Sequence, residues 1–159
     1  MTTEREFTAL AETYMDMIYR VALNAVRQPA DAEDVTQNVL LRLYRSGMQF
    51  ESSDHARHWL IRVTVNESKR LLAVPWRRQE TGLDEVAETV IPSAEPGQQE
   101  ILRCVLELPV KYRLPLYLYY YEGYSVKEIS RLLSRRESTV QTHLARGRER
   151  LRAVLEVEV

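Results

Sequence analysis

The chain has 159 residues, of which 45% are hydrophobic and 28% are charged, and its formal net charge is −1. This composition is ordinary for a soluble globular protein and excludes disorder from end to end. The single cysteine excludes an internal disulfide framework and fits a reducing compartment, so we expect a cytoplasmic protein. No apolar run is long enough to span a membrane, and the start, MTTEREFTAL, lacks the apolar core of a signal peptide, so we expect no membrane insertion.

The near-zero net charge hides an uneven distribution. Residues 1–72 hold 9 basic and 10 acidic side chains, whereas residues 101–159 hold 11 basic and 7 acidic ones. The excess lies in residues 125–152, with 8 basic against 3 acidic side chains. A basic segment confined to one part of a neutral chain indicates contact with a polyanion there, although a solvated helix face has the same composition.

Three helices are predicted in the first half of the chain. Apolar residues recur at steps of three and four over residues 4–27, and Gln28-Pro29 ends that helix. Asp31 is expected to cap a second helix, which Gly47 ends. Ser52, Ser53 or Asp54 opens a third helix near 54–72, although its β-branched residues also suit a strand. The apolar face of the second helix is predicted to contain Val35, Val39, Leu40, Leu43 and Tyr44.

Residues 74–97 differ from the rest of the chain. They are acidic, contain proline and end at Pro96-Gly97, and their apolar residues are scattered. This pattern indicates a flexible linker. The fold class is therefore predicted to be all-α, with small helical domains at 1–73 and 98–159 joined by the linker.

Helices resume from Gln98, and the first has an apolar face of Ile101, Leu102, Val105, Leu106 and Leu108. The next runs from about 110 to 122, with Pro115 near its start, where a missing N–H does least damage. Ser125 then caps a short helix, and Glu128 completes a capping box. The last helix covers about 137–155 and contains Gly147, which costs about 1 kcal/mol relative to alanine in a helix interior.

The short capped helix, the turn Ser134-Arg135-Arg136 and the basic last helix follow the helix-turn-helix plan. In that plan the start of the second helix meets base edges in the major groove. Hydroxyl and amide groups there can bind bases, and arginines can bind guanine or phosphate. The alternative is an ordinary helical hairpin in a bundle. The residues predicted to meet DNA are Arg135, Arg136, Ser138, Thr139, Gln141, Thr142, His143 and Arg146.

Three stretches resemble bacterial sigma factors. Residues 121–151, YEGYSVKEISRLLSRRESTVQTHLARGRERL, look like the module that reads the promoter −35 element. Residues 31–44, DAEDVTQNVLLRLY, are similar to the helix that docks on the RNA polymerase clamp, and residues 58–66, HWLIRVTVN, to the segment near the −10 element. Two such modules with a short linker resemble the extracytoplasmic function (ECF) sigma family of the sigma-70 superfamily.

The resemblance implies partners and residue roles. The partners are core RNA polymerase, promoter DNA and an anti-sigma factor, and neither a cofactor nor an enzymatic activity is implied. Polymerase contacts are implied for Asp34, Gln37 and Asn38. Contacts with the −10 region are implied for Asn66, with a basic patch suited to a single-strand backbone at Lys69, Arg70, Arg77 and Arg78.

Other interpretations have less support. The three histidines are scattered, and His55, His58 and Cys104 could bind zinc only if the two domains met, so we expect no metal site. Cys104 is expected in the core. A tyrosine cluster at 117–124 is expected to pack in the helix-turn-helix core. Two further functional classes stay open, namely a stand-alone helix-turn-helix regulator and an interaction protein that sequesters a partner.

Overall fold

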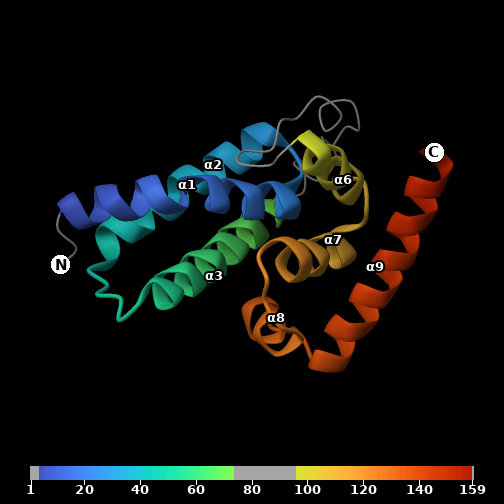
Figure 1. Cartoon of the computed structure of the whole chain (residues 1–159). Coiled ribbons are helices and arrows are strands. Elements are labelled where there is room, and N and C mark those ends of the chain that lie inside the picture. The colour runs from blue at the N-terminus through green and yellow to red at the C-terminus, as the bar shows by residue number, and fades with distance from the viewer. Residues whose placement is uncertain (1–3, 74–95, 159) are drawn as a thin grey trace. The chain divides into compact units, whose positions relative to one another are not determined.

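The computed structural model describes residues 4–73 and 96–158 and, within them, the side chains of 4–73 and 100–153. The described chain is helical apart from short turns, and it forms two compact units, one on each side of residues 74–95 (Figure 1). The all-α prediction is confirmed. The linker prediction and its residues Arg77 and Arg78 lie outside the described residues, except that Pro96 already begins a helix.

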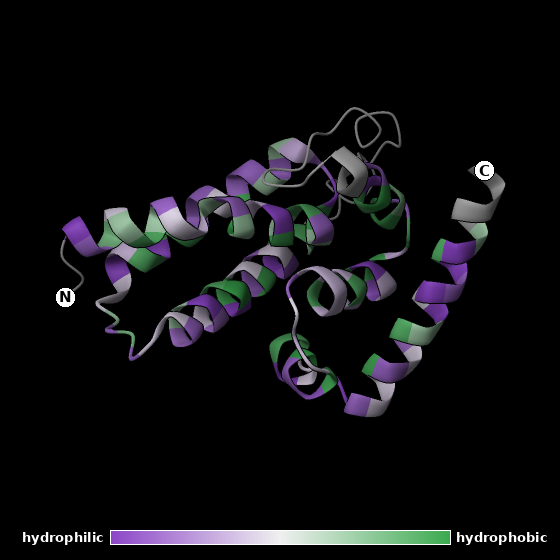
Figure 2. Cartoon of the chain, in the orientation of Figure 1, coloured by the Kyte–Doolittle hydropathy of each residue, from purple (hydrophilic) through white to green (hydrophobic). Residues whose placement is uncertain are grey.

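The first unit contains α1 (Glu4–Val26), α2 (Pro29–Ser46) and α3 (Ser53–Leu72), each packed against the other two. Hydrophobic and hydrophilic residues are interleaved along all three helices (Figure 2), as an amphipathic pattern requires. The three predicted helices are confirmed. The large, fully buried side chains of this unit are Ile18, Val21, Leu23, Leu43, Leu60 and Ile61.

The helix ends of the first unit differ in part from the prediction. Helix α2 begins at Pro29 and has no side-chain cap, so the prediction that Asp31 caps it is wrong. Proline suits the first helical position because its φ is already helical and its missing N–H would have no partner there. Gly47 ends α2 in the left-handed conformation (φ 65°), and Ser52 caps α3 by accepting from the N–H of His55, both as predicted.

Two expectations about α2 and α3 have different outcomes. The β-branched stretch of α3 is helical, and Thr64 and Val65 are buried in the three-helix body. Tyr44, in contrast, was predicted on the inward face of α2 but is 55% exposed. Its ring makes an edge contact with Phe7 at a centroid distance of 5.2 Å. Tyr44 thus covers the rim of the core, because its ring is amphipathic.

The second unit contains α6 (Pro96–Leu106), α7 (Val110–Leu116), the π-helix η1 (Tyr117–Tyr121), α8 (Val126–Leu133) and α9 (Glu137–Glu158). Cys104 is buried, as expected. Ile101 is 47% exposed, which contradicts its predicted inward position. The core of this unit is formed mainly by Leu106, Leu114, Leu116, Tyr117, Leu118, Ile129, Leu132, Leu133, Val140 and Leu144.

Gly147 lies where α9 crosses α7. A Cβ atom at this position would stand 2.8 Å from Cδ1 of the buried Leu116 and 3.2 Å from Cβ of Tyr112. A methyl group does not fit at such distances without displacing a packed side chain. The cost of glycine in a helix is therefore offset by the close approach of the two helices.

No helix of the described residues is long and apolar enough to cross a membrane. Within residues 4–73 and 96–158 there is also no group of His, Cys, Asp and Glu side chains that could hold a metal ion. His55 and His58 belong to the first unit and Cys104 to the second.

Candidate nucleic-acid interfaces

The helix-turn-helix of the second unit is closed by local hydrogen bonds. Ser125 Oγ accepts from the N–H of Glu128 at 3.1 Å, and Glu128 Oε1 accepts from the N–H of Ser125 at 3.1 Å. This is the predicted capping box. Ser134 takes the left-handed conformation (φ 55°) at the end of α8, and the N–H of Arg135 donates to the carbonyl of Ser130 at 3.0 Å. These bonds define the angle between α8 and α9.

The predicted DNA-contacting residues at the start of α9 divide into two groups. Thr139 is half-buried, and so are Arg135 and His143. Figure 2 shows a largely hydrophilic α9, which the buried Val140 and Leu144 anchor to the core. The turn before α9 and the start of α9 thus present hydrogen-bonding and basic groups to solvent. The exposed members are Arg136, Ser138, Gln141, Thr142 and Arg146.

Arg135 binds the backbone of α7. Pro115 lies beyond the first turn of α7 and has no N–H, so it cannot donate to the carbonyl of Lys111. Arg135 Nη1 donates to that carbonyl at 3.1 Å. Pro115 was expected near the start of its helix, where a missing N–H costs least, and this expectation is wrong because Pro115 lies beyond the first turn. Arg135, from the turn of the helix-turn-helix, supplies the donor that the proline lacks.

His143 packs beside the same contact. Its ring meets the Tyr112 ring edge-on at a centroid distance of 5.7 Å, and its Nδ1 lies 3.4 Å from Arg135 Nη1. Burial lowers the pKa of His143 below its ordinary value, and the positive charges of Arg135, Lys111 and Arg146 lower it further. A neutral imidazole is therefore favoured between these cations.

The tyrosine cluster is only partly in the core. Tyr117 and Tyr124 are buried, but Tyr119 and Tyr120 are exposed, so the expectation of core packing is wrong for these two. Tyr117–Tyr121 form a π-helical turn, and the Tyr121 ring stacks on the buried Tyr117 ring at a centroid distance of 5.2 Å. Tyr120 Oη accepts a hydrogen bond from Arg148 Nη1 at 2.8 Å.

The predicted polymerase-binding residues lie together on α2 of the first unit. Asp34, Gln37 and Asn38 are all exposed. Their spacing of three and four residues places them on one helix face. The structure therefore presents one carboxylate and two amides as a continuous polar row on that face.

The predicted −10 residues of the described chain lie on α3. Asn66, Lys69 and Arg70 are exposed, and they follow each other within the last two turns of the helix. Lys69 and Arg70 also lie in the last turn, where the helix dipole favours positive charge. This end of α3 combines an amide with two cations.

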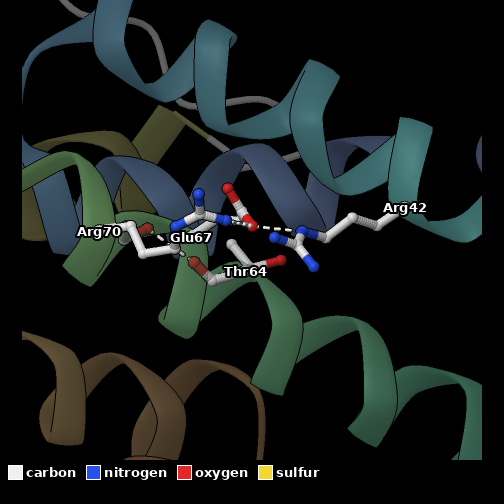
Figure 3. A network of polar contacts seen from close by, with 5 residues as sticks. Arg42, Thr64, Glu67 and Arg70 are labelled. Atoms are coloured by element: carbon white, nitrogen blue, oxygen red, sulfur yellow. Dashed lines mark hydrogen bonds and ion pairs between the residues drawn. The ribbon is translucent and has the colours of Figure 1, made fainter.

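Sequence analysis missed the ion-pair network between α2 and α3. Glu67 is buried, and its carboxylate pairs with Arg42 of α2 and, at 3.2 Å, with Arg70 of α3 (Figure 3). The spacing of Glu67 and Arg70 is a sequence signal for their pair. No sequence signal connects Arg42 with Glu67, because their contact depends on how α2 packs on α3.

Comparison with known families covers both units. The family model "Sigma-70 region 2" matches residues 10–78, and "Sigma-70, region 4" matches residues 98–151. The first match contains the α2 and α3 rows, and the second contains the helix-turn-helix. Sigma factors of this kind are transcription initiation factors and not enzymes. The chain belongs to the sigma-70 family, as an ECF sigma factor.

The relatives include ECF sigma factors from several bacteria. SigE of Mycolicibacterium smegmatis is 29% identical over 92% of this chain, and the match spans 60% of SigE. SigW of Bacillus subtilis is 28% identical over 94% of this chain and 88% of SigW. The sigma factor RpoE of Bartonella quintana, solved in complex with the anti-sigma factor NepR, has a TM-score of 0.72 at 16% identity, covering 98% of this chain and 99% of RpoE. That likeness shows a shared fold.

Proposed function

We propose that the chain acts in the bacterial cytoplasm, where it directs core RNA polymerase to specific promoters. Residues 1–73 dock on polymerase and help to melt the −10 element, and residues 98–159 read the −35 element as duplex. The observation that carries this proposal is the pairing of a polar row on α2 with a separate helix-turn-helix whose second helix begins in exposed hydrogen-bonding groups.

The first unit supplies the polymerase contact through Asp34, Gln37 and Asn38. The −10 contact is assigned to Asn66, Lys69 and Arg70 at the end of α3. Arg77 and Arg78, which lie outside the described residues, are assigned to the same contact from the sequence alone. Cations beside an amide suit a single strand, because phosphates need neutralisation and a splayed base offers hydrogen-bonding edges.

The second unit supplies the −35 contact. Gln141 and Arg146 are exposed on α9 and carry groups that recognise adenine and guanine edges, and Ser138, Thr139 and Thr142 add hydroxyls. Arg136 suits a phosphate. We assign Arg135 and His143 to positioning this helix, since their side chains contact α7 residues.

An anti-sigma factor is the proposed regulator. The RpoE relative was solved with NepR, and a protein that covers either polar row would block polymerase or promoter. Because the linker is short, binding by one unit raises the effective concentration of the other unit at its own target. A regulator that blocks either unit removes this gain, so blocking one unit is sufficient.

The test is binding of the full chain to core RNA polymerase. We expect tight binding by the wild type and at least tenfold weaker binding by the double variant Asp34→Ala/Gln37→Ala, because both polar partners are removed from the interface. The matched control is Glu12→Ala/Gln49→Ala, which removes one exposed carboxylate and one exposed amide from elsewhere on the first unit.

A folded wild-type chain that does not bind polymerase would overturn the proposal. Symmetric binding to duplex half-sites without polymerase would then favour a stand-alone regulator. Binding to an anti-sigma protein, with neither polymerase nor DNA bound, would favour a sequestering protein.

A further inference from the structure

An apolar cavity of about 360 Å³ lies in the second unit, where α6, α7, η1 and α9 meet. Its volume falls in the range of small-molecule sites. The residues that line it are mostly aliphatic or aromatic, and they come from all four of these helices. The proposed function assigns none of them to DNA or to polymerase, so the cavity needs an explanation of its own.

The inner side of the cavity is an apolar wall formed by Leu116, Tyr117 and Tyr121. Leu116 and Tyr117 are buried, and the Tyr121 ring stacks on the Tyr117 ring. The Tyr117 hydroxyl donates to Glu122 Oε1 at 2.5 Å, so its hydrogen bond is already made with the protein. A ligand therefore meets a wall that is already formed, and core side chains need not move to admit it.

The outer side of the cavity is incompletely covered. Ile101 and Tyr120 both line it, yet they are 47% and 58% exposed. A bound hydrocarbon group would remove this apolar surface from water, which is favourable. The cavity therefore favours a ligand that has a hydrocarbon part.

One charged side chain stands at the rim. Among the lining residues, which all belong to the described part of the chain, Arg148 is the only charged one. Its Nη1 donates to Tyr120 Oη at 2.8 Å, which holds the guanidinium beside the cavity. Arginine has five N–H groups, so further donors remain beyond this bond, and Tyr120 keeps its own hydroxyl proton. A guanidinium next to a hydroxyl donor suits a carboxylate.

We propose that this cavity binds a small amphipathic carboxylate of the class of a free medium-chain fatty acid. Arg148 and Tyr120 hold the carboxylate, and the hydrocarbon chain lies on the apolar wall. Arg148 repels a cation, and a ligand that is polar along its length leaves polar groups unpaired against the wall. The inference goes beyond the proposed function and stands without it, because its residues lie outside the polar rows on α2, α3 and α9.

The test is a methyl-NMR titration of the full-length chain with hexanoate, octanoate and decanoate, each below its micelle concentration. We expect the methyl signals of Leu116 and Leu151, which both line the cavity, to shift. Each methylene that enters the cavity should tighten binding about fourfold, so successive acids should differ about fifteenfold until the cavity is filled. Octylammonium, which has the opposite charge, should not bind.

The variant Arg148→Gln separates the charge from the cavity. We expect it to weaken decanoate binding about fivefold, as the loss of a favourable exposed charge pair does, and to leave decanol binding unchanged. Arg152→Gln is the matched control, because Arg152 is an exposed arginine of α9 that does not line the cavity, and it should retain both affinities. Damage to the fold would weaken the acid and the alcohol together.

A second measurement does not depend on variants. Because the ligand binds only the folded second unit, decanoate at about ten times its Kd should slow hydrogen exchange of the most protected amides of that unit about tenfold. Exchange in residues 4–72 should stay unchanged, since the cavity lies outside the first unit.

Any of three results would overturn the inference: unshifted cavity methyl signals with decanoate, equal binding of octanoate and octylammonium, or equal decanoate affinity in Arg148→Gln and the wild type. If no carboxylate binds and Ile101→Asp weakens binding to core RNA polymerase, the cavity belongs to a protein interface and the inference also fails. Each of these results leaves the proposed function intact, because polymerase binding by the wild type is measured separately.

Discussion

The two units each use one charged side chain to join helices at their candidate sites, and they use it in opposite ways. In the first unit a buried carboxylate, Glu67, holds Arg42 and Arg70 while both remain at the surface. In the second unit a cation, Arg135, donates a hydrogen bond to the backbone carbonyl of Lys111. The first arrangement leaves positive charge at the surface for a ligand, whereas the second directs positive charge into the protein.

This difference shows that a count of basic residues does not measure the charge a nucleic acid meets. Residues 125–152 are the most basic part of the chain, yet Arg135 is half-buried there, and burial lowers the pKa of its guanidinium. Residues 1–72 are nearly neutral, yet three of their arginines line one groove. Local packing decides which charges are available.

The largest expected effect tests how tightly α7 and α9 pack beside Arg135. We expect Gly147→Ala to lower the free energy of unfolding of the second unit by about 1–2 kcal/mol, because overpacking outweighs the gain in helix propensity. Hydrogen exchange of peptides from residues 110–153 measures this in the full chain. The matched control is Ala145→Gly on the exposed face of α9, which costs about 1 kcal/mol through propensity alone. A stabilised Gly147→Ala variant would show that the α7–α9 contact adapts easily.

The next effect separates Arg135 from its neighbour Arg136. Arg135→Ala is expected to destabilise the second unit by about 1 kcal/mol, since the carbonyl of Lys111 loses its donor, and to leave the salt slope of duplex binding unchanged. Arg136→Ala is expected to leave stability within about 0.5 kcal/mol and to reduce that slope by about 0.9, the value for one duplex phosphate. If Arg135→Ala changed the slope and not the stability, the contrast between the two units would fail.

The smallest effect concerns pH. Since the pKa of His143 is lower in the folded chain than its ordinary 6.5, the unfolded chain binds the proton more tightly. Stability of the second unit should therefore be complete above about pH 7 and fall modestly as the pH drops through 6.5 toward the lower, folded pKa. Thermal unfolding from pH 7.5 to 5.5 measures the fall, which should be smaller in His143→Gln. An equal fall in both chains would assign it to other groups.

Much of the fold follows from patterns within short windows. Apolar steps of three and four predicted the helices, and Ser52, Gly47 and the Ser125–Glu128 box marked their ends correctly, because capping depends on residues within one turn. Asp31 was wrong as a cap because Pro29, two residues earlier, already occupies the first helical position. Tyr44 and Ile101 were misplaced because a helical face is wider than the part that a neighbour covers.

By itself, the sequence determined the all-helical class, the helix-turn-helix and the exposed rows on α2, α3 and α9, since each depends on local periodicity and local hydrogen bonds. Only the tertiary structure decided that Gly147 allows a close helix crossing, that Arg135 replaces the N–H missing at Pro115, and that Glu67 joins Arg42 to Arg70. These three contacts join residues that are distant in the chain. These contacts are stabilised by close packing, hydrogen bonding and ion pairing between helices. The residue pattern along one helix does not predict which side chain of another helix it will contact.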